Sequence, residues 1–200
     1  MSDNKVILSV IKIGILGDSM VGKSAICNSF MGIEFTPESV TTIGHDRFEK
    51  QYKLKNGLEL KLVILDTAGQ ERFKSIATKA LKAVQGIIVV FDVTEKKTFD
   101  NVNEWLQKVK EDLSEPNIVI FGNKIDKVGR VISKEQAEKF AKSLNLTYFE
   151  TSAKLSQGIN EGLDYIINES YKKAIGNNNI VIDTNKKKKK EKTGCFGKKK

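Results

Sequence analysis

Residues 17–24 constrain the fold of this chain more than any other segment. Their sequence, Gly-Asp-Ser-Met-Val-Gly-Lys-Ser, matches the pattern G-x-x-x-x-G-K-[ST] at every fixed position. A strand-like run at residues 6–16 precedes it and a helix-like run at 25–31 follows it, as the pattern requires. Backbone N–H groups of such a loop, with the positive end of the following helix dipole, bind phosphate oxygens. The sequence therefore predicts a phosphate-binding loop rather than a chance glycine turn. Lys23 would reach the β- and γ-phosphates, and Ser24 would offer its hydroxyl to Mg²⁺.

Strand-like and helix-like runs alternate along the chain. We expect strands at residues 7–16, 45–54, 58–65, 86–91, 117–121 and 147–150, and helices at 23–31, 69 to about 84, 99–113, 133–143 and 159–174. This alternation predicts an α/β fold with a doubly wound, mostly parallel six-stranded sheet and about five helices. Asn56-Gly57 is a strong hairpin signal, so one strand should lie antiparallel at an edge. In such sheets ligands bind beyond the carboxyl ends of the strands.

Asp66, Gly69 and Gln70 follow the predicted strand at 58–65. A carboxylate at a strand end can hold magnesium, usually through water, opposite Ser24. Gly69 has no side chain, so its backbone can approach a γ-phosphate closely. The amide of Gln70 can orient an attacking water. A lone D-x-x-G pattern is often only a turn, but here it ends a strand in a chain with an intact phosphate loop.

A second polar motif, Asn123-Lys124-Ile125-Asp126, follows the predicted strand at 117–121. A carboxylate accepts hydrogen bonds from an N–H and an exocyclic amine, which guanine presents on one edge and adenine does not. A site built around Asp126 therefore favours guanine and leaves adenine unpaired. The alternative is a polar turn after a strand, which the position at another strand end disfavours.

Thr151-Ser152-Ala153-Lys154 follows the predicted strand at 147–150. The small Ala153 would let a backbone N–H reach a base oxygen. The aliphatic stem of Lys154 could cover the face of the base.

Five blocks in this order resemble the motifs of the Ras-superfamily small GTPases: residues 17–24, Thr42-Ile43-Gly44, 66–71, 123–126 and 152–154. Together they cover residues 7 to 175. Four segments resemble the Rab branch in particular: Gly17-Asp18-Ser19, Thr42-Ile43-Gly44, Gln70-Glu71-Arg72-Phe73 and residues 86–94. The chain is identified as a divergent member of that branch. The resemblance implies a P-loop small G domain that binds and hydrolyses GTP as a molecular switch in vesicle-mediated transport.

The resemblance also implies the roles of individual residues. Thr42 is implied as a magnesium-ligating hydroxyl beside Ser24 and Asp66, and Phe35 as the aromatic ring that packs against guanine. Gln70 and Lys23 are the implied catalytic residues. The implied GTP-binding residues are Gly17, Asp18, Ser19, Met20, Val21, Gly22, Lys23, Ser24, Ala25, Phe35, Thr42, Asp66, Gly69, Asn123, Lys124, Asp126, Ser152, Ala153 and Lys154.

Residues 34–46 and 66–80 are implied to be two switches, ordered by GTP and loosened after hydrolysis. An exchange factor, a GTPase-activating protein and effectors are expected to bind there. The first switch has no arginine clearly placed as a finger in cis, with Arg47 and Arg72 only nearby. Intrinsic hydrolysis is therefore expected to be slow and to depend on an activating partner.

Several positions depart from the Rab pattern. Met20 stands where relatives usually carry glycine, serine or alanine, and its side chain would either point outward or alter nucleotide exchange. Arg47 replaces a typical phenylalanine, and Ala80-Leu81 replaces an aromatic pair. These positions are expected to face partners, so the usual effectors are not implied. His45, the only histidine, is expected to be a partly exposed strand residue rather than a pH sensor.

The basic charge is concentrated at the C-terminal end. The net charge is +9, and residues 186–200 hold nine lysines and one glutamate. We expect a G domain at residues 1–176 and a flexible lysine-rich tail at 177–200, attracted to an anionic membrane surface. Cys195 is a candidate for prenylation or palmitoylation, although the C-a-a-X pattern does not fit. The alternative is a solvated tail with an incidental cysteine. No nucleic-acid partner is expected, because base-stacking aromatics are not interleaved with the lysines apart from Phe196.

The sequence has neither a secretory signal nor an apolar run long enough to span a membrane. We therefore expect a cytoplasmic monomer that is peripheral on the cytosolic face of an endomembrane or the plasma membrane. Two other functional classes stay open. One is a nucleotide-binding interaction module that does not cycle, suggested by Met20. The other is an ATP-dependent P-loop kinase, which residues 123–126 disfavour.

Overall fold

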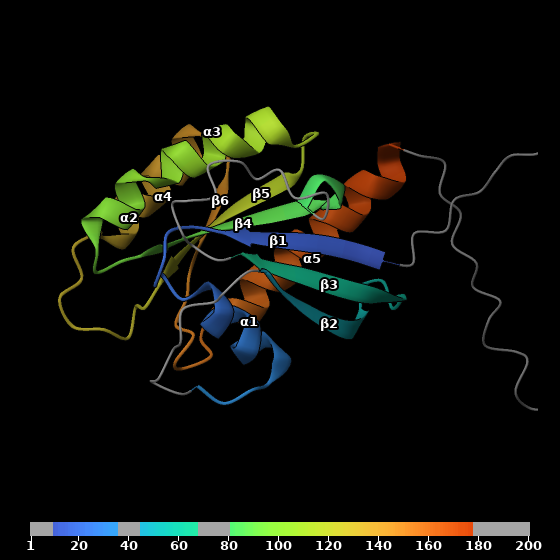
Figure 1. The fold of residues 1–200 in the computed structure, drawn as a ribbon, viewed down its shortest axis with the longest axis horizontal. Helices are drawn as coiled ribbons and strands as arrows, with labels where there is room; N and C mark the ends of the chain where they lie inside the picture. Colours follow the sequence, from blue (N-terminus) through green and yellow to red (C-terminus); the bar gives the residue numbers. More distant parts are fainter. Residues whose placement is uncertain (1–9, 36–44, 68–80, 178–200) are drawn as a thin grey trace, which may run out of the picture.

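The computed structural model describes residues 10–35, 45–67 and 81–177. They form a six-stranded sheet in the order β2-β3-β1-β4-β5-β6 (Figure 1). The strands are β1 (Val10–Leu16), β2 (His45–Lys53), β3 (Glu59–Thr67), β4 (Gly86–Asp92), β5 (Asn117–Asn123) and β6 (Thr147–Glu150). β2 is antiparallel to β3 at one edge, and all other neighbours are parallel. The predicted fold class is confirmed.

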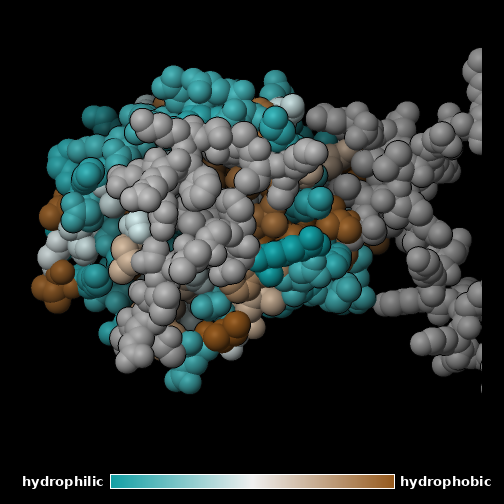
Figure 2. Space-filling model, in the orientation of Figure 1, coloured by the Kyte–Doolittle hydropathy of each residue, from teal (hydrophilic) through white to brown (hydrophobic). Residues whose placement is uncertain are grey.

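Helices cover both faces of this sheet. They are α1 (Lys23–Met31), α2 (Lys96–Asp100), α3 (Val102–Asp112), α4 (Lys134–Ser143) and α5 (Ile159–Asn177), with a short 3₁₀ helix, η1 (Leu81–Ala83). α1 and α5 pack on one face, and α2, α3 and α4 on the other (Figure 1). The surface over α3 is hydrophilic (top of Figure 2), as expected for the solvent side of an amphipathic helix.

The central strands are buried on both faces. In β4, Ile88 and Val90 pack towards α1 and α5, whereas Ile87, Val89 and Phe91 pack towards α2, α3 and α4. This alternation explains why the sequence shows an uninterrupted apolar run there instead of an apolar–polar pattern.

Two predicted local signals are present. Gly57 has a φ of 86°, and the N–H of Leu54 donates to the carbonyl oxygen of Leu58 at 2.8 Å, which closes the hairpin between β2 and β3. The hydroxyl of Ser133 accepts a hydrogen bond from the N–H of Gln136 at 3.1 Å and caps α4.

One predicted helix, at 99–113, is in fact two. Asn101 separates α2 from α3, and its side-chain amide donates to Asp18 at 2.7 Å, a contact across 83 positions of sequence. The predicted helix from 69 to about 84 lies mostly outside the described residues, and its end forms η1.

The five parallel strands end at one edge of the sheet, so the polar residues that follow them are brought together. Within the described ranges, no helix combines the length and the hydropathy that crossing a membrane requires.

Candidate functional site

Two glycines give the loop between β1 and α1 its shape. The φ angle is 140° at Gly17 and 99° at Gly22. A Cβ on Gly17 would lie 2.2 Å from the carbonyl oxygen of Val90, and one on Gly22 would lie 2.4 Å from the side-chain nitrogen of Asn123. A side chain at either position would therefore strain the backbone and collide with a neighbour. The loop follows β1 and leads into α1, which is the setting that the motif requires.

Lys23, the first residue of α1, reaches back over this loop. Its Nζ donates to the carbonyl oxygens of Gly17 at 2.9 Å and Asp18 at 2.7 Å. The side chain is buried, and this burial lowers the pKa of Lys23 to about 8 against the opposing charges of Asp66 and Asp18. Since a buried ammonium is stabilised by anions, phosphate oxygens are suitable ligands for it.

Ser24 and Asp66 meet beside Lys23. The Ser24 hydroxyl donates to Oδ2 of Asp66, which is fully buried on β3. A hydroxyl and a carboxylate are the oxygen ligands that Mg²⁺ prefers, so the pair fits this ion. In the part of the chain that the structure describes, no group of three or more His, Cys, Asp or Glu side chains could hold a metal.

Asn123 links three segments of the site. Its Nδ2 donates to the carbonyl oxygen of Val21 at 2.9 Å, and its Oδ1 accepts from the Thr151 hydroxyl and the Ala153 N–H, both at 3.2 Å. Asn123 is buried and acts here as a structural bridge. The Ala153 N–H, expected at a base oxygen, is engaged with Asn123 in this structure.

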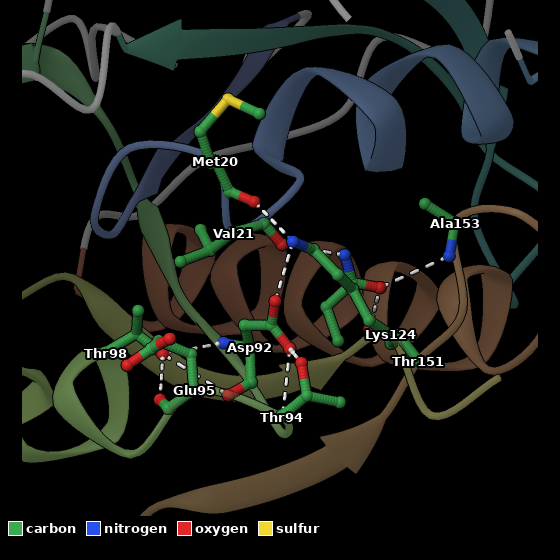
Figure 3. Close-up of polar contacts among 10 residues, drawn as sticks. Met20, Val21, Asp92, Thr94, Glu95, Thr98, Lys124, Thr151 and Ala153 are labelled. Atoms are coloured by element: carbon green, nitrogen blue, oxygen red, sulfur yellow. Dashed lines mark hydrogen bonds and ion pairs between the residues drawn. The ribbon is translucent and has the colours of Figure 1, made fainter. Parts of the chain in front are cut away.

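Lys124 lies across the phosphate loop. Its Nζ donates to the carbonyl oxygen of Met20 at 2.6 Å and pairs with Oδ2 of Asp92 at 2.6 Å (Figure 3). Its backbone is left-handed, with a φ of 69°. Asp92 ends β4 and lies in the Rab-like segment 86–94, but no role in the site was predicted for it. The available signal was the one that pointed to Asp66, an acidic residue at the end of a buried strand.

Hydrogen bonds keep Asp92 ionised. Burial acts to raise its pKa, but hydrogen bonds from Lys124 and from the hydroxyl and N–H of Thr94 outweigh burial and lower the pKa. The carboxylate is thus a fixed negative charge beside Lys124 at neutral pH.

Asp126 and Ser152 form the far side of the site. The buried Ser152 hydroxyl donates to Oδ1 of Asp126 at 2.6 Å and accepts from the N–H of Leu155 at 3.0 Å. Asp126 itself is half-buried, and Lys154 is exposed. Ser152 therefore orients the carboxylate that was predicted to recognise guanine.

A model of the Ras family matches residues 12–172, from β1 into α5. The chain belongs to the Ras family. It is 38% identical over 178 residues to Ras-related protein SEC4 of Saccharomyces cerevisiae, covering 86% of this chain and 80% of that protein. It is 40% identical to GTP-binding protein ypt2 of Schizosaccharomyces pombe (83% and 84% covered) and to Ras-related protein Rab-18 of Caenorhabditis elegans (76% and 75% covered). The predicted resemblance is confirmed: this is a Rab-like small GTPase of the Ras superfamily.

Met20 is the main departure in the phosphate loop of this Ras-family chain. Its backbone is left-handed, with a φ of 66°, a conformation that favours glycine. The side chain is 60% exposed and points away from Lys124 and Asp92 in Figure 3. The side chain therefore points outward, as one of the two alternatives predicted, and an effect of Met20 on nucleotide exchange stays a prediction.

Asp18 is turned towards α3. Its carboxylate accepts from the Asn101 amide at 2.7 Å and from the Trp105 indole N–H at 2.8 Å. Its backbone carbonyl accepts from Lys23. Any contact of Asp18 with phosphates would therefore come from its backbone. Among its neighbours, Ser19 is exposed, Val21 is buried, and Ala25 packs against the core of α1 and α5.

Only the ends of the two predicted switches are described. Phe35 follows α1 and is partly exposed, and the exposed Arg47 pairs with Glu49 on β2. Leu81 was expected to face partners, but this is wrong: it is 3% exposed and packs next to Gly14 of β1, in the core on the sheet face that α2, α3 and α4 cover. The absence of a side chain at Gly14 leaves room for it. Thr42, Gly69, Gln70, Arg72, Ala80, Cys195 and the side chain of His45 lie outside the described residues.

Proposed function

We propose that this Rab-like chain binds GTP and hydrolyses it to GDP and phosphate, acting as a switch in vesicle-mediated transport. One observation carries the proposal: Lys23, the Ser24–Asp66 pair and the Asp126–Ser152 pair all lie at the same edge of the sheet. That edge thus combines groups suited to phosphate with groups suited to a purine edge.

The base would be recognised by Asp126. Its carboxylate, oriented by Ser152, can accept from the N–H and the exocyclic amine of guanine, while adenine would leave it unpaired. This chemistry supports guanine over adenine and argues against an ATP-dependent kinase.

Hydrolysis requires a water to attack the γ-phosphorus in line with the bond to the bridging oxygen. That bond breaks, GDP leaves with the electron pair, and the proton of the water passes to phosphate. Lys23 stabilises the charge on the phosphates, and Gln70 orients the water. Ser24, Thr42 and Asp66 would hold Mg²⁺, which neutralises phosphate charge when it is bound.

The proposed intrinsic rate is slow, on the order of 10⁻⁴ s⁻¹. Arg47, which directly follows the first switch in the sequence, has its guanidinium engaged by Glu49. A GTPase-activating protein would then supply the missing positive charge. It would bind residues 34–46 and 66–80, which would also bind an exchange factor and effectors.

The proposal extends to the ends of the chain. Residues 1–176 form the G domain, and the lysine-rich tail at 177–200 attaches the monomer to an anionic cytosolic membrane face, with Cys195 as a site for a lipid. A second candidate is a module that binds nucleotide without cycling. The non-glycine backbone of Met20 in the left-handed region favours it.

Single-turnover phosphate release tests the proposal and separates the two candidates. The GTP-loaded protein with Mg²⁺ should release one phosphate per molecule, slowly, and Gln70→Leu should slow this release by about tenfold or more. Met20→Gly serves as the matched variant. If the wild type releases no phosphate whereas Met20→Gly does, the chain is the non-cycling module.

A further inference from the structure

We propose that Asp92 is a positioning residue that holds Lys124 across the phosphate loop and thereby slows the release of the guanine nucleotide. The inference rests on the proposed function, because it concerns the same site. Asp92 belongs to none of the motifs that point to nucleotide binding, and it would act through Lys124.

The ammonium of Lys124 joins three segments of the chain. It is shared between Oδ2 of Asp92, at the end of β4, and the carbonyl oxygen of Met20, in the loop after β1, each at 2.6 Å (Figure 3). The two side chains are only 21% and 8% exposed. Charge-assisted hydrogen bonds are strong when water is largely excluded, so this pair fixes where the ammonium lies.

The backbone of Lys124 also indicates a constrained residue. A φ of 69° is rare outside glycine and persists where surrounding contacts determine it. The adjacent Asn123 donates to the carbonyl oxygen of Val21 at 2.9 Å. Asn123 and Lys124 therefore donate to two successive carbonyl oxygens of the phosphate loop. Asn123 is short and buried, whereas the lysine side chain is long and needs a partner to stay in place. Asp92 is that partner.

The two oxygens of Asp92 have separate tasks, which makes the proposal testable. Oδ1 accepts from the N–H of Thr94 at 2.8 Å and from its hydroxyl at 2.7 Å, which shapes the turn after β4. Oδ2 forms the ion pair with the ammonium of Lys124. Asp92→Asn keeps an acceptor for the turn and places an amide N–H₂ against the ammonium. Thr94→Val removes the hydroxyl from the turn and leaves the ion pair.

The experiment measures dissociation of a fluorescent GDP from the full-length protein with Mg²⁺ and excess unlabelled GDP. Asp92→Asn should accelerate dissociation about tenfold. Thr94→Val should stay within about twofold of the wild type. In a Lys124→Met background, adding Asp92→Asn should change the rate by less than about twofold, because a residue that acts through Lys124 has nothing left to position.

Three results would overturn the proposal. The first is a GDP dissociation rate of Asp92→Asn equal to that of the wild type, and the second is an acceleration by Thr94→Val as large as that by Asp92→Asn. The third is a double variant, Asp92→Asn with Lys124→Met, in which the two single accelerations multiply. The first would leave the proposed function intact. If the wild type failed to bind GDP, both the role of Asp92 and the proposed function would be contradicted. Circular dichroism checks folding, and Asp92→Ser, which keeps a smaller acceptor, replaces Asp92→Asn in the same cycle if that variant does not fold.

Discussion

Lys23 carries a buried charge that the phosphate loop alone stabilises poorly. Its pKa is lowered from 10.5 to about 8 by burial. Between these two pH values the unfolded chain holds a proton that the folded chain does not, so stability without nucleotide should rise with pH. Burial raises the pKa values of Tyr52 and Tyr148. Above about pH 10 these two residues therefore make the stability fall with pH, which opposes the effect of Lys23.

The free energy of unfolding of the nucleotide-free protein should therefore increase by about 1–2 kcal/mol from pH 8 to pH 9.5. Urea unfolding at the two pH values measures it. Lys23→Met is the control and should lack the increase. A wild-type stability that falls over this interval would show that the ammonium is better stabilised than its burial indicates.

Trp105 and Asp18 provide a second test at this scale. Trp105→Phe keeps an aromatic ring at this largely buried position, but it removes the indole N–H that Asp18 accepts together with part of the packed ring. The expected loss is about 1.5–3 kcal/mol of stability, as for a hydrogen bond to a charged group. Denaturant unfolding followed by circular dichroism measures it. The loss should shrink in an Asp18→Ala background, which has no acceptor for the indole N–H, and an undiminished loss there would assign it to ring packing instead.

At the scale of the elements, α5 packs on β5 at Gly162 without room for a side chain. A Cβ there would lie 2.4 Å from Cζ of Phe121. Gly162→Ala should therefore destabilise the fold by about 1–3 kcal/mol, although alanine is the better helix former. At Gly176, in the same helix, a Cβ would have no neighbour within 4 Å, so Gly176→Ala should be neutral or stabilising. Thermal unfolding of the two variants measures these changes in stability. Equal changes for Gly162→Ala and Gly176→Ala would contradict the packing argument.

Elements with local signals were predictable from the sequence. α1 and β6 have the predicted bounds, and left-handed glycines flank α1 at Gly22 and Gly32. The break at Asn101 was not predictable, because it coincides with a contact to Asp18 that is distant in sequence. The same reason explains why the burial of Leu81 and the pairing of Asp92 with Lys124 were missed. The candidate site was predicted by motif, but which of its side chains bind one another depends on the sheet order.

At the scale of the whole molecule, the charge is divided between a nearly neutral body and a basic tail. Residues 186–200 carry a net charge of +8 out of +9. Each lysine near an anionic membrane contributes about 1 kcal/mol. Full-length protein should therefore co-sediment with vesicles that contain anionic lipid, and binding should weaken with salt. Protein lacking residues 186–200 should remain in solution. Equal binding of both forms would place the membrane contact in the body.

The central claim is a guanine nucleotide site formed where the parallel strands end, and nucleotide affinity tests it most directly. Fluorescent GDP should bind the wild type with Mg²⁺ and resist competition by ATP. Asp126→Asn offers one acceptor and one donor in place of two acceptors, so it should weaken GDP by about 100-fold or more and favour xanthosine diphosphate. Binding that ATP displaces, or that Asp126→Asn leaves unchanged, would contradict the account.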